Sequence, residues 1–215
     1  MKLLGMTPEE LRSVALEAGL PPFAGKQLAR WLYVRKVKDF DSMTDISKAG
    51  REALKERFEI GAVPPSMFSE SSDGTRKYLF PVECEMKGRA EPERSCVEAV
   101  MIPDDDRKTL CVSSQAGCRM GCRFCMTGKQ GFHGNLSAAD ILSQIIGVEE
   151  SASLTNVVFM GMGEPLDNYD NVMQFLRLLS CAEGRNLSLR HVSLSTCGIV
   201  PMIDRLAEEQ LPLTL

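Results

Sequence analysis

The chain has 215 residues, of which 44% are hydrophobic and 25% are charged, and this composition excludes general disorder. Its formal net charge of −4 excludes a uniformly basic nucleic-acid binder. No apolar run approaches the length of a membrane span and the N-terminus has no signal-peptide core, so the sequence predicts a soluble cytoplasmic protein with no membrane partner.

Residues 1–60 predict a small N-terminal helical domain. Thr7 and Glu10 have the spacing of a capping box, which is typical of the first turn of a helix. Apolar residues at helical spacing predict a second helix from about Ala24 and a third from about Ser47.

Residues 61–106 differ in character and predict a β-hairpin connector of short antiparallel strands. We expect a turn at 72–74, strands at 77–80 and 96–102, and a polar turn at 87–89. These strands are expected to lead into the following domain.

Residues 107–215 alternate between strand and helix patterns. Strands are predicted at 109–113, 156–160 and 191–195, and helices after Ser137, at 172–179 and from Pro201. This alternation predicts an α/β fold with a parallel sheet or barrel.

The chain stops at Leu215, inside an apolar run that begins at Leu211 and predicts the start of a fourth strand. Three strands and the start of a fourth cannot close a barrel. We therefore expect an incomplete (β/α) barrel, truncated after the start of the fourth strand, and further residues in the natural protein.

Charge is distributed unevenly along the chain. Residues 107–139 contain no acidic side chain, although they contain five basic ones, Arg107, Lys108, Arg119, Arg123 and Lys129. A second basic stretch lies between Lys26 and Lys38. Such segregation can steer a polyanion to one face, whereas solvated faces of an acidic protein would give the same pattern.

Three of the eight cysteines, Cys118, Cys122 and Cys125, lie within eight consecutive residues in a C-x3-C-x2-C pattern that follows a predicted strand. Iron–sulfur clusters are normally held by four thiolates. Three thiolates in one loop leave one iron of a four-iron cluster without a protein ligand, where a substrate or cofactor can bind. The alternative is a zinc site with His133 as the fourth ligand, or three buried cysteines.

This spacing resembles that of the radical SAM superfamily. The resemblance implies that Cys118, Cys122 and Cys125 hold a [4Fe-4S] cluster and that its open iron binds S-adenosylmethionine (SAM), whose one-electron reduction yields a 5′-deoxyadenosyl radical.

Four further segments, 109–115, 130–132, 161–166 and 194–198, narrow the resemblance to the dual-specificity RNA methyltransferases of the RlmN type. The resemblance implies methylation of C2 of an adenosine in 23S rRNA and in tRNA. It also implies an electron donor such as flavodoxin, and a monomer when the chain is complete. One alternative is the related family that methylates C8 of the same ribosomal adenosine and confers antibiotic resistance. A remote alternative is an iron–sulfur or zinc protein without SAM chemistry.

The resemblance also assigns cofactor-binding residues. Gly163, Glu164 and Ser195 follow predicted strands, where α/β folds bind ligands, and they match SAM contacts of the family. From the residues alone, Gly163 and Glu164 could belong to a plain strand-to-helix turn, and Ser195 could cap a helix.

Two further residues match catalytic positions of the family. Glu98 matches the proton acceptor, and Cys111 matches a cysteine that resolves a covalent protein–RNA intermediate. Alone, Glu98 would be a solvent-facing strand residue and Cys111 a small buried one. The family also methylates a second cysteine in its C-terminal part, but no cysteine follows Cys197. The 215-residue chain is therefore expected to be inactive alone.

Four cysteines match no role that the sequence supports: Cys84, Cys96, Cys181 and Cys197.

Overall fold

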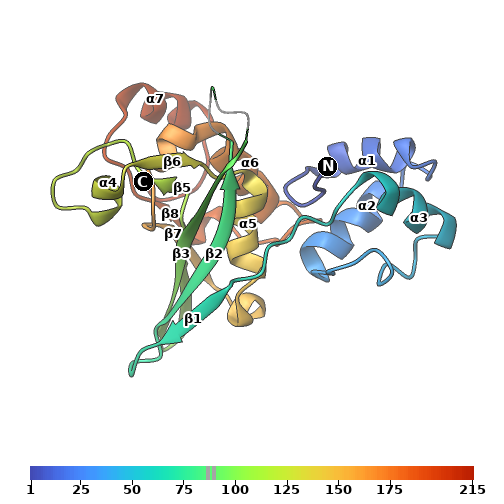
Figure 1. The fold of residues 1–215 in the computed structure, drawn as a ribbon, viewed down its shortest axis with the longest axis horizontal. Helices are drawn as coiled ribbons and strands as arrows, with labels where there is room; N and C mark the ends of the chain where they lie inside the picture. Colours follow the sequence, from blue (N-terminus) through green and yellow to red (C-terminus); the bar gives the residue numbers. More distant parts are fainter. Residues whose placement is uncertain (86–87, 89–90) are drawn as a thin grey trace.

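The computed structural model describes all residues except 86, 87, 89 and 90. A lobe of helices formed by the first 60 residues lies at one side of a twisted sheet, and the remaining helices pack on that sheet (Figure 1). The predicted turn at 87–89 lies outside the described residues except for Gly88. The mixed α/β fold predicted from the sequence is confirmed.

The N-terminal lobe contains α1 (Pro8–Glu17), α2 (Ala24–Ala29), the π-helical turn η1 (Arg30–Val34) and α3 (Lys48–Arg57). Thr7 Oγ1 accepts the Glu10 N–H (3.3 Å), and the Glu10 carboxylate accepts the Thr7 N–H (2.7 Å), so the predicted capping box is present. Ser47 caps α3 through the Gly50 N–H.

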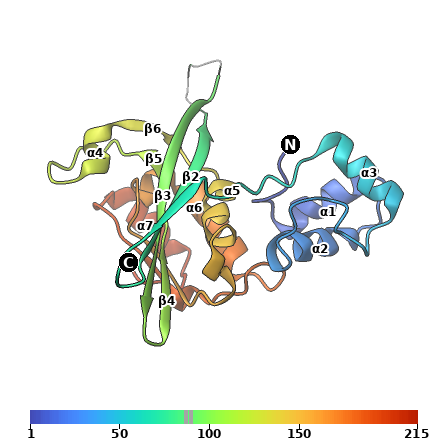
Figure 2. The same cartoon turned by 60° about the horizontal axis from the view of Figure 1, so that its bottom comes forward.

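Six strands of the described residues form one sheet in the order β1-β2-β3-β4-β7-β8. Their bounds are β1 (Met67–Glu70), β2 (Arg76–Cys84), β3 (Glu93–Asp104), β4 (Arg107–Cys111), β7 (Asn156–Phe159) and β8 (Val192–Leu194). Neighbours from β1 to β4 are antiparallel, and β4, β7 and β8 are parallel. β2 and β3 are longer than the sequence predicts. Because β3 pairs with β4, the antiparallel strands β1 to β3 and the parallel strands β4, β7 and β8 form one continuous sheet (Figure 2).

The two faces of the sheet differ. Along β3, buried Val97, Ala99 and Met101 alternate with more exposed residues that include Glu98. The buried face is covered by α5 (Ala138–Ile146) and α6 (Tyr169–Ser180), as Figure 1 shows. The opposite face, which carries the side chains of Glu98 and Val100, is called here the open face.

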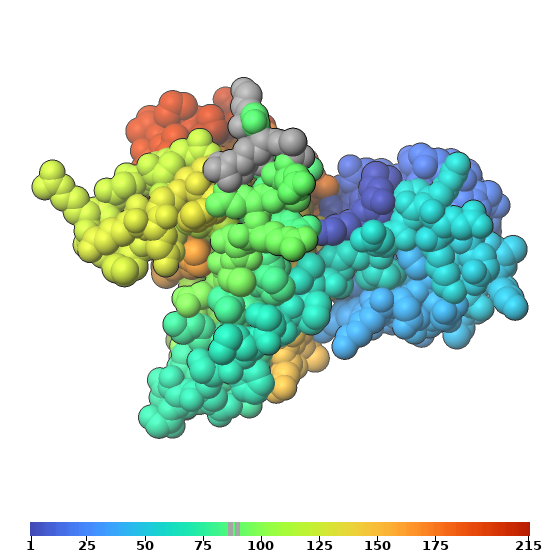
Figure 3. Space-filling view, in the orientation of Figure 1, coloured from blue at the N-terminus to red at the C-terminus, as the bar shows by residue number. Residues whose placement is uncertain are grey.

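A small hairpin that the sequence did not predict holds the cysteine loop. It consists of β5 (Gln115–Gly117) and β6 (Phe132–Asn135), with α4 (Met126–Gln130) between them. Gly117 has a φ of +73°, and a Cβ there would lie 1.9 Å from the Gly131 carbonyl oxygen. Only glycine fits at position 117, where the backbone passes close to that of Gly131. In the space-filling view the loop region projects from the sheet on the side away from the helical lobe (Figure 3).

The remaining elements are α7 (Val200–Glu208) and three 3-10 turns, η2 (Glu149–Ala152), η3 (Pro165–Asn168) and η4 (Leu189–His191). The predicted fourth strand is present only as a single parallel bridge between Thr214 and Ser193. No helix within the described residues is long and apolar enough to span a membrane.

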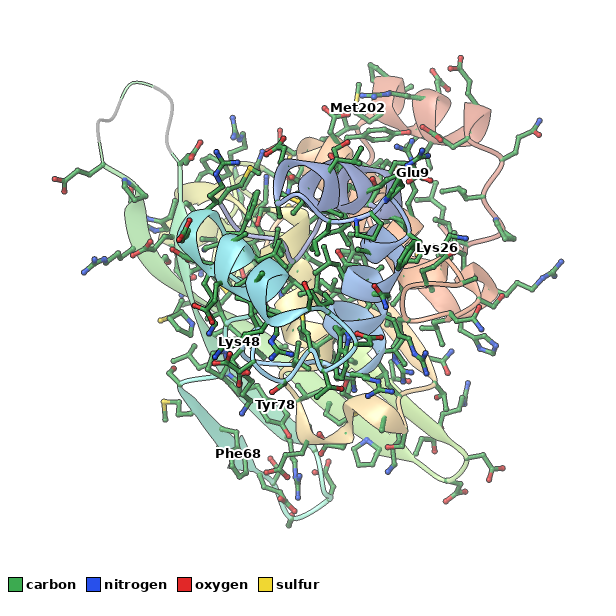
Figure 4. All side chains as sticks on the ribbon, turned by 90° about the vertical axis from the view of Figure 1, so that its right-hand side faces the viewer. Glu9, Lys26, Lys48, Phe68, Tyr78 and Met202 are labelled. Carbon is green, nitrogen blue, oxygen red and sulfur yellow. The ribbon has the colours of Figure 1, made fainter. Side chains whose placement is uncertain are left out.

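The helical lobe shares one buried apolar cluster with the sheet domain, and polar contacts add to it. Gln174 in α6 donates a hydrogen bond to the Gly5 carbonyl (2.7 Å), and Lys26 lies 3.7 Å from Glu183. Figure 4 shows Lys26 and Glu9 on the same side of this lobe, whereas Phe68 and Tyr78 lie together on the sheet, with ring centroids 5.6 Å apart.

Candidate radical SAM site

The loops that follow the parallel strands meet at the carboxyl end of the sheet. The Met162 N–H, after β7, donates to Ser113 Oγ, after β4, at 2.9 Å. The Cys197 N–H, after β8, donates to Glu164 Oε2 at 2.7 Å. The structure thus brings together three segments that the sequence singled out separately, where α/β folds bind ligands.

Backbone hydrogen bonds anchor the start of the cysteine loop and form a turn near its end. The Cys118 N–H donates to the Gly131 carbonyl (2.9 Å), and the Cys125 N–H donates to the Cys122 carbonyl (3.0 Å). Cys125 precedes α4, and the Gly128 N–H, followed by the Thr127 N–H, holds the pKa of its thiol below the usual value. Burial, and then the nearby Cys122 and Cys125, raise the pKa of Cys118.

The donor set of this loop fits a cluster with three protein ligands. No three His, Cys, Asp or Glu side chains of the described residues stand together at metal-binding distances. The chemistry nevertheless matches, because three thiols share one loop and the N–H groups in the first turn of α4 favour the Cys125 thiolate that an iron–sulfur cluster requires.

His133 does not offer a free nitrogen for zinc. Its Nδ1 lies 2.6 Å from Glu93 Oε1, and its Nε2 lies 3.1 Å from the Gln130 carbonyl oxygen. Both ring nitrogens therefore face oxygen acceptors. Since this residue was the candidate fourth ligand, the donor set favours a cluster over zinc.

Glu164 is a buried carboxylate, 4% exposed, that joins two loops. Its Oε1 accepts the Leu166 N–H (2.9 Å) and the Thr196 hydroxyl (2.8 Å), and its Oε2 accepts the Cys197 N–H. Burial, and then a hydrogen bond from the Cys197 side chain to Glu164, raise the pKa of the Cys197 thiol to about 11. A carboxylate has about four acceptor positions, and these four donors occupy them, so a ligand such as an ammonium group would replace one of the donors.

Gly163 is required by packing. Its φ is +97°, and a Cβ there would lie 2.5 Å from the Cβ and 2.7 Å from the backbone nitrogen of Gln115. The loop after β7 therefore presses on the segment after β4. Ser195 is exposed at the end of β8, and it caps no helix, because the residue before α7 is Ile199.

Glu98 and Cys111 lie on the open face. Val100, which is on the same face as Glu98, pairs with Cys111. Glu98 lines a cavity of about 580 Å³ that also touches Thr127 of α4 and Met162. Cys111 is outside that lining, and burial raises the pKa of its thiol.

Sequence reasoning missed a group of buried polar residues behind the loops. Ser113 Oγ donates to the Glu98 carbonyl (2.6 Å), and its N–H donates to Gln144 Oε1 (2.8 Å). Asn168 Nδ2 donates to the carbonyls of Ser114 and Leu136. The polar run 113–115 directly after an apolar strand was the one available signal.

Two family models match the chain. Residues 1–60 match the Ribosomal RNA large subunit methyltransferase N-terminal domain, and residues 112–213 match the Radical SAM superfamily. That superfamily uses a [4Fe-4S] cluster and SAM.

Curated proteins and a solved structure are similar to this chain over nearly its whole length. A probable dual-specificity RNA methyltransferase RlmN of Porphyromonas gingivalis is 52% identical over 97% of this chain and 58% of its own length. That of Parabacteroides distasonis is 51% identical over the same shares. A radical SAM methyltransferase from Sphaerobacter thermophilus, solved by crystallography, matches with a TM-score of 0.86 and 36% identity over 99% of this chain and 62% of its own.

The chain thus spans 58% of the length of these curated relatives. The match to the Radical SAM superfamily includes the cysteine loop and the loops that follow β7 and β8. The chain belongs to the RlmN-type family of radical SAM proteins.

Proposed function

We propose that this chain is part of a radical SAM methyltransferase that methylates C2 of a specific adenosine in 23S rRNA and in tRNA. The observation that carries the proposal is the contact of the cysteine loop with the segment of Glu164, where Arg119 Nε lies 2.9 Å from Asp167 Oδ2 beyond the carboxyl end of β7. The relatives named as dual-specificity RNA methyltransferases support the substrate class.

Cys118, Cys122 and Cys125 would hold the cluster. When bound, the cluster supplies the electron that cleaves SAM. Gly163, Glu164 and Ser195 follow the parallel strands β7 and β8, at the end of the sheet where α/β folds bind ligands, so we assign the three residues to SAM.

Glu98 is proposed as the group that accepts the proton lost from the adenine. Its carboxylate faces the cavity beside α4, and its backbone carbonyl is held by Ser113 Oγ. A general base must lie within reach of the proton that it removes, and this carboxylate is fixed on a strand but open to a ligand.

Cys111 is proposed as the thiol that releases the product. On β4 it pairs with Val100 of β3, so it lies on the same open face of the sheet as Glu98, although it is outside the lining of the cavity that Glu98 faces. In this proposal a cysteine beyond residue 215 carries the methyl group to the RNA and stays linked to the base through that carbon. The Cys111 thiolate then attacks the sulfur of that cysteine. A disulfide forms, the sulfur–carbon bond breaks, and its electron pair stays on the carbon, which takes up a proton and becomes the methyl group of the product.

The partners follow from the same proposal. The basic, acid-free stretch 107–139 surrounds the cysteine loop and would attract RNA phosphates. The complete protein, proposed as a monomer, would take its electrons from a donor such as flavodoxin. We further propose units at 1–60, 61–106 and 107–215, as the sequence predicts.

The test uses the protein that contains this sequence together with the region present in its relatives. It is incubated anaerobically with SAM, a reductant and unmodified 23S rRNA or tRNA, and the nucleosides are separated by mass spectrometry. 2-Methyladenosine is the expected product. 8-Methyladenosine would assign the chain to the C8-specific relatives, and no methylated adenosine would refute the proposal.

A further inference from the structure

Arg119, the residue after Cys118, reaches out of the cysteine loop to two other segments. Its Nε lies 2.9 Å from Asp167 Oδ2 in η3, and its guanidinium carbon lies 3.8 Å from the centre of the Phe132 ring in β6. A planar guanidinium can stack on an aromatic ring and pair with a carboxylate at once. Arg119 therefore joins the start of the cysteine loop to two separate elements.

Asp167 links Arg119, through Gln115, to the backbone of Glu164, which is proposed to bind SAM. Its Oδ2 also accepts a hydrogen bond from Gln115 Nε2 (2.7 Å). Gln115 Oε1 in turn accepts the Glu164 N–H (2.8 Å). A continuous chain of polar contacts thus runs from the residue beside Cys118 to the backbone of Glu164.

The packing around this chain leaves little room for adjustment. Gln115 is fully buried, and Gly163 packs directly against it. The Asp167 side chain is 21% exposed and that of Arg119 is 50% exposed. Buried polar networks of this kind fix one arrangement, because a broken member leaves its partners unsatisfied.

We propose that Arg119 and Asp167 are positioning residues that hold the cysteine loop in register with the loop of Glu164. This inference rests on the proposed function, since it assigns the cluster to one loop and SAM to the other. Neither residue is proposed to touch the reacting atoms. Loss of the pair should therefore loosen the loops and weaken SAM binding while the cluster still assembles.

The chain contains a matched control. Arg205 in α7 also lies 2.9 Å from a carboxylate, that of Asp170, and its guanidinium carbon lies 4.1 Å from the ring centre of Tyr169. It is 48% exposed. Arg205→Gln also removes an ion pair and a stacking contact, but from a helix that carries no proposed ligand residue. It therefore measures the effect of losing such contacts at a site outside the cysteine loop.

The first measurement is hydrogen exchange on the chain before reconstitution, which needs neither cluster nor SAM. Arg119→Gln and Asp167→Asn should both speed exchange in peptides that contain the Cys118 and Glu164 amides. Arg205→Gln should leave those peptides at the wild-type rate. Equal exchange in the Arg119 and Arg205 variants would overturn the inference.

The second measurement is the electron paramagnetic resonance spectrum of the reduced, reconstituted protein titrated with SAM. We expect wild-type iron content in each variant, but SAM affinity about ten-fold weaker in Arg119→Gln and Asp167→Asn, the size of effect common for residues that orient ligands. The double variant should be no weaker than either single one, because the two residues act as a unit.

The two measurements distinguish failure of the proposed function from failure of the positioning role of Arg119 and Asp167. If the wild-type cluster does not respond to SAM, the proposed function fails, and the exchange experiment still decides whether Arg119 holds the loops together. If SAM binds to the wild type and with equal affinity to Arg119→Gln, the positioning role is wrong and the proposed function remains.

Discussion

The Lys77 ammonium lies 3.2 Å from Glu98 Oε1, across the antiparallel pair of β2 and β3. Both side chains are about half exposed, and an ion pair at such a site is weak. Lys77 therefore orients the Glu98 carboxylate without closing it to a ligand, which suits a group that must accept a proton.

Glu98→Gln is expected to abolish most methylation in the complete protein while leaving the cluster and SAM binding intact. The amide keeps the shape of the side chain but cannot take a proton, and loss of a general base commonly costs about two orders of magnitude or more. Methylated nucleosides are quantified by mass spectrometry. Lys77→Gln is the companion variant and should retain far more activity. Near-normal product from Glu98→Gln would remove this residue from the mechanism.

Replacement of Cys118, Cys122 or Cys125 by alanine is expected to prevent cluster assembly. Anaerobic reconstitution of the wild type should give about four irons per chain, the content of a cubane cluster. Iron and sulfide analysis measures this, and Cys181→Ala, a cysteine outside the loop, should keep the wild-type content. Stoichiometric zinc without sulfide in the anaerobically purified protein would contradict the assignment.

Cys111→Ala is expected to trap a covalent protein–RNA adduct in the complete protein. The thiol acts only after carbon has been attached to the base, so earlier steps proceed and release fails. Denaturing gel electrophoresis with labelled RNA detects the adduct. Normal turnover without an adduct would show that Cys111 is merely a packing residue of β4.

Gly163→Ala is expected to destabilise the fold more than Gly198→Ala. Both glycines have positive φ, +97° and +96°, but a Cβ at Gly198 would meet nothing within 4 Å, whereas one at Gly163 would collide with Gln115. The Gly198 variant should lose about 1 to 2 kcal/mol from backbone strain. The Gly163 variant should lose a further ~1 to 3 kcal/mol from overpacking. Urea denaturation compares them, and equal losses would show that the Gln115 contact is not restrictive.

Cys84 is expected to make the fold sensitive to alkaline pH. Burial, and then the charges of Asp140 and Glu93, raise the pKa of its thiol from 9.0 to about 11. The unfolded chain therefore loses this proton first, so the stabilising contribution is complete below pH 9 and is lost as pH rises to about 11.

Urea denaturation at a series of pH values tests this dependence. Cys84→Ala should be less stable at neutral pH, because it leaves a cavity, but its stability should fall less steeply between pH 9 and 11 than that of the wild type. Parallel curves for the two proteins would show that Cys84 does not contribute.

The sequence by itself determined the features that depend on neighbours a few residues away. The capping residues Thr7 and Ser137 and the C-x3-C-x2-C loop are readable because their hydrogen bonds or shared ligands lie within about one turn or one loop. Strands β4, β7 and β8 and helices α5, α6 and α7 were predictable for the same reason, since hydrophobic periodicity is a local pattern.

Only the tertiary structure decided how distant segments meet. The hairpin of β5 and β6, whose strands flank the cysteine loop, and the contact of Glu164 with Cys197 are not encoded in any local pattern. Glu164 is paired with a backbone N–H 33 positions away, and Arg119 with Asp167 in a different loop. Such partners are chosen by sheet register and by the packing of buried groups, which depend on the whole fold at once.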